Sequence, residues 1–94
     1  MTTSTATAQE ITRNLNMTQI LALRHLCHHE GSTAKDLSVA TGLSTAAITG
    51  LKDKFAILGL MEEKRDAIDR RKTRMSPTAL GRAVLKAADG MLAA

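Results

Sequence analysis

The chain contains one Phe, no Trp and no Tyr in 94 residues, so any hydrophobic core must be built almost entirely from aliphatic side chains and Met. Strands of sandwiches and barrels are rich in aromatic and β-branched residues, whereas Leu and Ala favour helices. The sequence therefore predicts a mainly helical fold in one small domain. Its apolar runs are far shorter than the roughly 20 residues that cross a bilayer, which excludes a membrane span.

The charge of the chain favours an anionic partner. Lys and Arg exceed Asp and Glu, which gives a formal net charge of +4 and a pI of about 9.7. The single cysteine cannot form an internal disulfide, and residues 1–9 lack the basic start and apolar centre of a signal peptide. These features predict a soluble, cytoplasmic protein.

Three helices are predicted between residues 15 and 58, because apolar residues recur there at helical spacing between capping residues and glycines. Glycine tolerates the left-handed conformation in which many helices end. The predicted starting residues are Asn16 or Thr18, Ser32 or Thr33, and Ser44, and the predicted ends are Gly31, Gly42 and Leu58.

A change of pattern after Gly59 predicts a β-hairpin. Residues 60–65 and 73–75 are typical of two short strands, and the polar segment 66–70 suits the tip between them. Pro77 is expected to break the second strand, and Thr78 to cap a final helix.

Two short helices joined by a turn and followed by a hairpin are the layout of a winged helix-turn-helix, a mainly α fold with a small β-hairpin. We therefore divide the chain into a flexible tail (1–8), a winged helix-turn-helix DNA-binding domain (9–77) and a carboxy-terminal helix for dimerisation (78–94). The amino-terminal residues of a recognition helix reach base edges in the major groove of DNA. In this chain they are small or carry hydroxyls, and two lysines further along are expected to reach phosphates. The predicted recognition-helix contacts are Ser44, Thr45, Ala46, Thr49, Gly50, Lys52 and Lys54.

The hairpin carries much of the positive charge of the chain. Six of its 13 basic residues lie there, and Asp66 and Asp69 are the only acids between residues 64 and 74. Such an arm suits contact with phosphates, or insertion of an Arg into a minor groove. The predicted wing contacts are Lys64, Arg65, Asp69, Arg70, Arg71, Lys72 and Arg74.

The most specific motif of the chain is Asp66-x-x-Asp69-Arg70-Arg71 in the hairpin. Thr78 and Gly81 follow it at a fixed spacing. Further residues belong to the same pattern as this motif. They are Leu15, Gln19, Leu23, Leu26, Thr33, Leu37, Gly42, Leu43, Ser44, Ile48, Thr49, Leu51, Asp53, Gly59 and Leu60.

With these residues the chain resembles the MarR family of bacterial transcriptional regulators, from Leu15 to about Arg82. The resemblance implies a winged-helix DNA-binding regulator encoded by a bacterium or a phage. In the family, the wing Asp and Arg residues form a structural and DNA-contacting cluster. That role falls here on Asp69, Arg70 and Arg71.

The chain departs from the family pattern in the recognition helix and at both ends. Family members usually carry Arg where this chain has Gly50, and glycine inside a helix costs about 1 kcal/mol relative to Ala. The long amino-terminal helix of the family is shortened, and its pair of carboxy-terminal helices is reduced to one. Because those parts normally build the dimer interface and the pocket for phenolic effectors, a small-molecule effector is not favoured.

Cys27 and the neighbouring histidines can be interpreted either as structural residues or as functional ones. Cys27 lies beside Leu26 on an apolar helix face, which favours a buried, inert thiol over a redox sensor. His25 and His29 share a helix face at the spacing of metal ligands, but no third ligand accompanies them at a firm spacing. We therefore predict no metal and no cofactor. Thr49 has an alternative too, because its hydroxyl can bond back to its own helix.

The last helix leaves a second apolar edge that a small monomer would struggle to hide, which predicts a homodimer. The residues expected at the dimer contact are Ile11, Leu80, Val84, Leu85, Ala88, Met91 and Leu92. No phosphate-binding loop, paired carboxylates or nucleophile–base set is suggested by spacing, so we predict no enzymatic activity.

The sequence thus predicts a regulator that binds double-stranded DNA with sequence specificity. We expect a repressor that recognises an inverted repeat as a homodimer. Two alternatives remain open: a protein-interaction module built on a winged helix, and a protein that organises or segregates DNA with little sequence preference.

Overall fold

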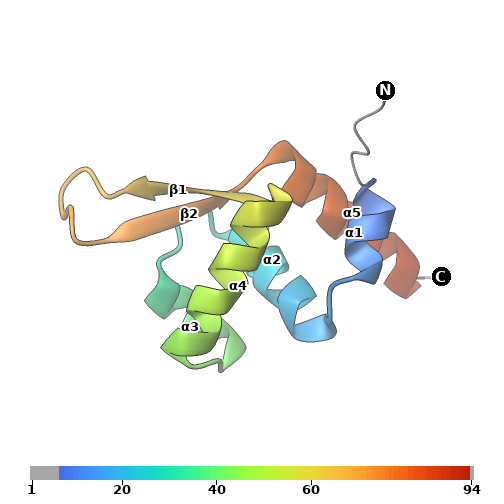
Figure 1. Cartoon of the computed structure of the whole chain (residues 1–94), viewed down its shortest axis with the longest axis horizontal. Helices are drawn as coiled ribbons and strands as arrows, with labels where there is room; N and C mark the ends of the chain where they lie inside the picture. The colour runs from blue at the N-terminus through green and yellow to red at the C-terminus, as the bar shows by residue number, and fades with distance from the viewer. Residues whose placement is uncertain (1–6, 94) are drawn as a thin grey trace.

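The computed structural model describes residues 7–93, with side chains described as far as residue 91. The described residues form five helices and one hairpin, and the hairpin extends away from the helices (Figure 1). Their bounds are α1 (Ala8–Arg13), α2 (Met17–His28), α3 (Ala34–Thr41), α4 (Thr45–Leu58), β1 (Met61–Arg65), β2 (Thr73–Pro77) and α5 (Ala79–Ala93). The predicted mainly α fold with a β-hairpin is confirmed. Of the tail predicted at residues 1–8, residues 1–6 lie outside the described part, whereas Thr7 caps α1 and Ala8 begins it.

Short-range hydrogen bonds at the capping residues start the central helices. The Asn16 side chain accepts a hydrogen bond from the Gln19 backbone N–H at 2.8 Å, and the Gln19 side chain accepts one from the Asn16 N–H at 3.0 Å. Thr33 and Asp36 form the same reciprocal capping box at the start of α3. Asn16 and Thr33 are therefore the caps, and not Thr18 or Ser32.

Glycines end α3 and α4 as predicted, but not α2. Gly42 and Gly59 both have φ of +75°, a left-handed conformation that side chains with a Cβ rarely adopt. The last helical residue of α2 is His28, and Gly31 lies beyond it with φ of +83°. Gly31 donates its N–H to the Met75 carbonyl oxygen at 2.8 Å, so it serves the junction with the hairpin.

One core of aliphatic side chains fills the space between the helices and the base of the hairpin. Phe55, the single aromatic residue, is 1% exposed and lies within this core. Its largest fully buried neighbours come from every element except α1 and β1: Leu23, Leu26, Leu37, Ile48, Leu60, Met75 and Val84. The predicted aliphatic core is confirmed.

The hairpin is antiparallel and pairs Met61 with Pro77 at one end and Arg65 with Thr73 at the other. The strand ends at Pro77 as expected, but β2 includes this residue and so runs past the predicted end at Met75. A strand end tolerates proline, which has no N–H to donate to a neighbouring strand. On its other edge β2 meets the segment after α2, where Met75 bridges to Ser32. The hairpin is thereby fixed to the helical body on two sides.

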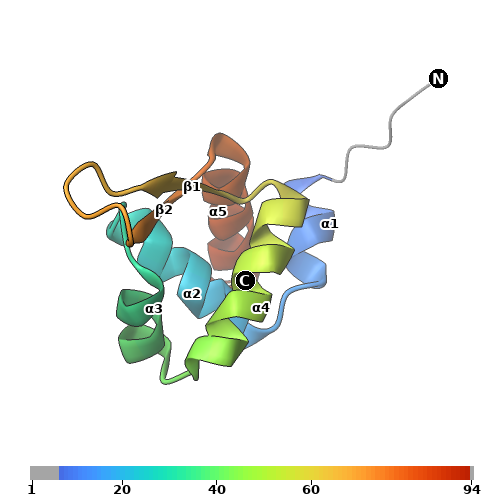
Figure 2. The same ribbon diagram turned by 60° about the vertical axis from the view of Figure 1, so that its left-hand side comes forward.

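A close backbone contact fixes the start of α5. The Thr78 hydroxyl donates to the Gly59 carbonyl oxygen at 2.5 Å and accepts from the Gly81 N–H at 3.0 Å. A Cβ at Gly81 would lie 2.1 Å from the Leu60 carbonyl oxygen, so only glycine fits there. α5 then runs back beside α1, as both views show (Figures 1 and 2).

The apolar face of α5 is used inside the chain. Ile11, Val84, Leu85 and Ala88, all predicted at the dimer contact, are buried in the chain's own core. The expectation that Leu85 lies on a second exposed edge is wrong, because this side chain is 8% exposed. Of the other predicted dimer residues, Leu80 is half-buried, Met91 is 40% exposed, and the side chain of Leu92 lies outside the described part. In the part of the chain that the structure describes, no helix is long and apolar enough to cross a membrane.

Candidate nucleic-acid interface

α4 presents a face of small residues to solvent over its first two turns. Ser44 caps the helix by accepting a hydrogen bond from the Ala47 N–H at 3.2 Å. The next exposed residues on the outer face are Thr45, Ala46, Thr49 and Gly50. The Thr49 hydroxyl donates to the Thr45 carbonyl oxygen at 3.0 Å, as the alternative from the sequence anticipated, and its oxygen can still accept from a ligand.

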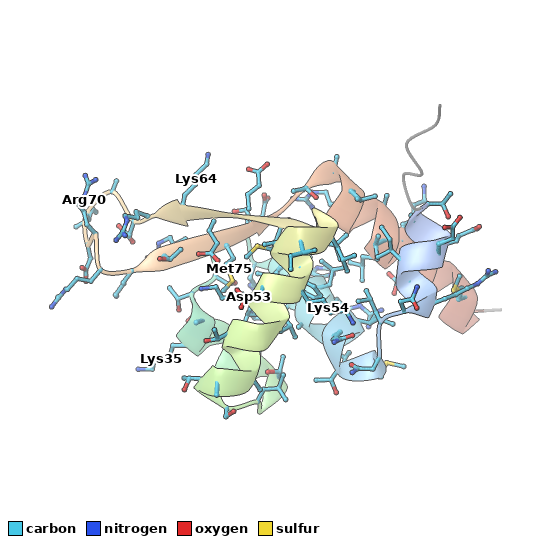
Figure 3. The ribbon with its side chains drawn as sticks, in the orientation of Figure 1. Lys35, Asp53, Lys54, Lys64, Arg70 and Met75 are labelled. Carbon is cyan, nitrogen blue, oxygen red and sulfur yellow. The ribbon has the colours of Figure 1, made fainter. Side chains whose placement is uncertain are left out.

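Both lysines predicted to reach phosphates from α4 already have partners in the chain. Lys52 is half-buried and pairs with Glu63 of β1, with 3.3 Å between Nζ and Oε1. The Lys54 ammonium donates to the Asn14 carbonyl oxygen and to the Gln19 side chain, each at 3.2 Å. Lys54 therefore lies on the flank of α4 that faces α2 (Figure 3). Because each ammonium group already has partners in the chain, either lysine is expected to contribute less to binding a phosphate.

Asp53 and Ile57 lie on the exposed face of α4, and neither was predicted from the sequence as a site residue. Asp53 is exposed, and Ile57 is 84% exposed, one turn further along. Helical spacing was the available signal, since Asp53 follows Thr49 by four residues and Ile57 follows Asp53 by four. An acid in the middle of this face repels phosphates, so the amino-terminal half of α4 is its part best suited to approach DNA.

Asp66 organises the tip of the hairpin, which we call the wing tip (residues 66–72). Its Oδ1 accepts hydrogen bonds from the backbone N–H groups of Ile68 at 2.8 Å and Asp69 at 3.2 Å, and its Oδ2 accepts from Arg74 Nε at 2.7 Å. These bonds, with the Ile68 backbone contributing most, lower the pKa of the Asp66 carboxyl group to about 2. Asp66 belongs to the wing motif of the sequence but was not predicted as a site residue.

Asp69 orders the arginine next but one in sequence. Its Oδ1 accepts hydrogen bonds from the Arg71 N–H at 3.1 Å and from Arg71 Nε at 3.2 Å. The Arg71 side-chain bond, followed by the backbone bond, lowers the pKa of the Asp69 carboxyl group. The Arg71 side chain is still 91% exposed, so its guanidinium is oriented and accessible at once.

The remaining wing cations divide into anchored and outward-facing groups. Arg74 donates to the Gly31 carbonyl oxygen at 2.9 Å, which ties the wing to the segment after α2, and Arg65 donates to the Arg70 carbonyl oxygen at 2.8 Å. The side chains of Lys64 and Arg70 extend from the hairpin away from the helices (Figure 3). The structure therefore brings the predicted wing residues together on one arm and gives them different tasks.

Lys35 of α3 joins this basic surface through the fold alone. A shallow hollow between α3 and the wing is lined by Thr33, Lys35, Asp36, Lys72 and Arg74. Lys35 is exposed and points outward below the hairpin (Figure 3). Only tertiary packing brings it beside Lys72, 37 positions further along the chain, and no sequence motif indicated it.

Cys27 and the histidines give no sign of a reactive or metal-binding site. Cys27 is half-buried, and burial raises the pKa of its thiol, which disfavours the reactive thiolate. The His25 and His29 rings lie 4.6 Å apart between centroids. Burial, followed by repulsion from His29, lowers the pKa of His25. Within the described residues, no three His, Cys, Asp or Glu side chains gather as a metal site.

Known proteins match both the sequence and the fold. The model of the MarR family matches residues 13–72, and no curated protein matches the chain significantly in sequence. A mutant of S. aureus MepR superposes with a TM-score of 0.83 at 20% identity, covering 92% of this chain and 66% of that one. PcaV, a transcriptional regulator from Streptomyces coelicolor, gives 0.82 at 21%, covering 86% and 60%. The transcriptional repressor CouR, bound to a 23-mer DNA duplex, gives 0.80 at 25%, covering 84% and 56%.

These structural neighbours share the winged helix-turn-helix fold with this chain. Each of them is longer, since this chain spans between 56% and 66% of their lengths.

Proposed function

The chain belongs to the MarR family of winged-helix transcription regulators, and from this premise we propose that it binds double-stranded DNA with sequence specificity. One observation carries the proposal: a recognition helix with a small, hydroxyl-bearing face is joined to a wing from which Lys64 and Arg70 extend into solvent. Together they offer a groove-reading surface and a phosphate-binding arm.

In this proposal the amino-terminal half of α4 enters the major groove. Thr45, Ala46, Thr49 and Gly50 are exposed there, and a Cβ at Gly50 would meet nothing within 4 Å. Small side chains let the helix backbone approach the bases, and hydroxyls can bond to base edges or phosphates. Sequence preference is expected to depend on these residues.

The wing supplies most of the sequence-independent affinity. Lys64, Arg70 and Arg71 are exposed, and Asp69 orients Arg71. Lys35 extends the cationic surface from Lys72 onto α3. Each phosphate that these groups neutralise releases counterions and steepens the salt dependence of binding. The predicted phosphate contacts of Lys52 and Lys54 become secondary, because both ammonium groups are already held within the chain.

We extend the proposal to a homodimeric repressor that recognises an inverted repeat, with half-sites about 10–10.5 bp apart. The likeness to CouR, a repressor bound to a DNA duplex, supports repression over activation. Such a regulator acts in the cytoplasm of a bacterium, where the DNA is, and family membership fits a non-enzymatic role. Because Val84 and Leu85 serve the chain's own core, dimerisation must use other surface, such as that around Met91.

Fluorescence anisotropy tests the proposal directly. The purified protein is titrated into labelled duplexes from its own upstream region and into a scrambled duplex, across a salt series. Tight, salt-sensitive binding to one fragment and weak binding to the scrambled duplex is the expected result. Similar affinity for every duplex would favour an organiser of DNA, and no binding to any duplex would favour a protein-interaction module.

The oligomeric state is tested separately by sedimentation. A dimer is expected in the presence of the bound fragment, with two protomers for each inverted repeat. One protomer on a complete repeat would contradict the homodimer. That outcome would leave the proposed DNA binding unaffected.

A further inference from the structure

Ile68 lies in the wing tip, between β1 and β2, and is 97% exposed, more than any other large hydrophobic side chain in the described residues. Single exposed apolar residues are common on protein surfaces, so exposure by itself carries no argument. Two further features set Ile68 apart: hydrogen bonds fix the backbone that presents it, and exposed cationic residues flank it in the sequence.

The wing tip is a closed, hydrogen-bonded loop. Asp66 Oδ1 accepts a hydrogen bond from the Ile68 N–H at 2.8 Å. The Asp66 N–H donates to the Lys72 carbonyl oxygen at 2.9 Å, and the Lys72 N–H donates to the Asp69 carbonyl oxygen at 3.0 Å. Arg74 links this loop to the segment after α2, because it donates to both Asp66 and the Gly31 carbonyl oxygen. The backbone at Ile68 is therefore held in one conformation at the wing tip, which lowers the entropy lost when this loop contacts a partner.

The charges around Ile68 define the chemistry of that partner. Arg65, Arg70, Arg71 and Lys72 all lie within four residues of Ile68 along the chain, and all four are exposed. A partner must therefore offer negative charge at its rim and an apolar surface within. The minor groove of a DNA duplex has this form, with phosphates along both edges and deoxyribose walls inside.

We propose that Ile68 packs into the minor groove as an apolar contact at the tip of the wing, with the neighbouring cations on the flanking phosphates. The inference rests on the DNA binding proposed above and adds a contact that reads groove shape. A·T pairs leave the floor of the minor groove open, whereas the 2-amino group of guanine fills it. The wing is therefore expected to prefer A·T-rich sequence beside the half-site.

The first test separates an apolar contact from an electrostatic one. Ile68→Ser should weaken binding to the preferred duplex about tenfold or more, while the slope of log affinity against log salt stays unchanged. Ile68→Leu should keep most of the affinity. Val39→Ser removes another exposed aliphatic side chain, 78% exposed on α3, and serves as the matched control that should leave affinity unaltered. Thermal unfolding of each variant checks that the fold is intact.

The second test locates the contact in the minor groove. Replacing adenine by 2,6-diaminopurine adds an amino group in the minor groove and leaves the major-groove pattern unchanged. The affinity lost by this replacement should be smaller for Ile68→Ser than for the wild type, which is the coupling that a double-mutant cycle measures. Equal losses in both proteins would overturn the groove assignment.

The outcomes distinguish this inference from the proposed function. If the wild type binds a fragment tightly and Ile68→Ser binds it equally well, the inference fails and the DNA-binding function stands. If the wild type binds no duplex, the function fails and the inference falls with it. Binding to phosphatidylglycerol vesicles that is lost in Ile68→Ser, with duplex binding retained, would also overturn the inference by assigning Ile68 to a membrane surface.

Discussion

At the scale of single residues, Asp66 shows how one carboxylate can order a functional loop. It accepts two backbone hydrogen bonds from the wing tip and one bond from Arg74, which in turn binds the Gly31 carbonyl oxygen. The side chains proposed to touch DNA, Ile68 and Arg70 among them, therefore depend on a carboxylate that is itself only 12% exposed. In the sequence, Asp66 was visible only as part of a motif.

Replacing Asp66 by Ala should loosen the wing tip and weaken DNA binding severalfold. The Ile68 and Asp69 N–H groups lose their acceptor, so their hydrogen exchange should become faster, which NMR measures residue by residue. Glu62→Ala is the matched control, because it removes one exposed acid from the same hairpin. If both variants leave exchange at the wing tip unchanged, the role assigned to Asp66 is wrong.

The same carboxylate makes the wing tip sensitive to acid. Its pKa is about 2 in the folded chain, below the ordinary value of 3.8. The ordering that it provides is therefore fully present above about pH 4 and is lost as the pH falls through 2. An NMR titration of the Ile68 amide should show a midpoint near 2. A midpoint near 3.8 would mean that the carboxylate does not hold the loop.

At the scale of elements, two glycines of α5 lie in opposite surroundings, one in close contact with the backbone and one in open space. Gly81 lies against the Leu60 carbonyl oxygen, whereas a Cβ at Gly90 would meet nothing within 4 Å. Both residues lie in the same helix, so the effect of helix propensity on each is comparable.

Gly81→Ala should destabilise the chain by about 1–3 kcal/mol, because the added carbon must push α5 away from the turn after α4. Gly90→Ala should instead stabilise it, by up to about 1 kcal/mol. Denaturant unfolding of the two variants measures both values. Equal stabilities would contradict the close contact at Gly81.

Gly50 tests the approach of α4 to DNA. Gly50→Ala should stabilise the chain by about 0.5–1 kcal/mol, since the position is helical and open. It should also weaken binding to the preferred duplex, because the added methyl group keeps the helix backbone from the bases. Higher stability together with unchanged affinity would show that the backbone of α4 does not approach the duplex closely at this residue.

Element types and most helix ends could be predicted because their signals are local. Capping by Asn16, Thr33 and Ser44 and the left-handed Gly42 depend on residues within four positions along the chain. The end of α2 was misplaced because Gly31 serves a bridge to β2, more than 40 residues away. Contacts at such distances leave no periodic trace in one sequence.

At the scale of the whole molecule, the charge on the candidate interface depends on tertiary partners. Sequence spacing predicted that α4 and the wing would both contact DNA, but it could not show that Glu63 and Gln19 hold Lys52 and Lys54. It also could not show that Lys35 joins the wing. The burial of Leu85 has the same origin, since α5 packs against both α1 and α2.

The salt dependence of duplex binding, measured by anisotropy for the wild type and two charge-matched double variants, tests the central claim most directly. Arg70→Ala with Arg71→Ala removes two exposed wing cations, and Lys52→Ala with Lys54→Ala removes two held cations. For B-DNA each lost phosphate contact lowers the slope by about 0.9, so the wing variant should lose nearly two units and bind every duplex more weakly. The α4 variant should lose less. Full affinity and an unchanged slope in the wing variant would contradict the account.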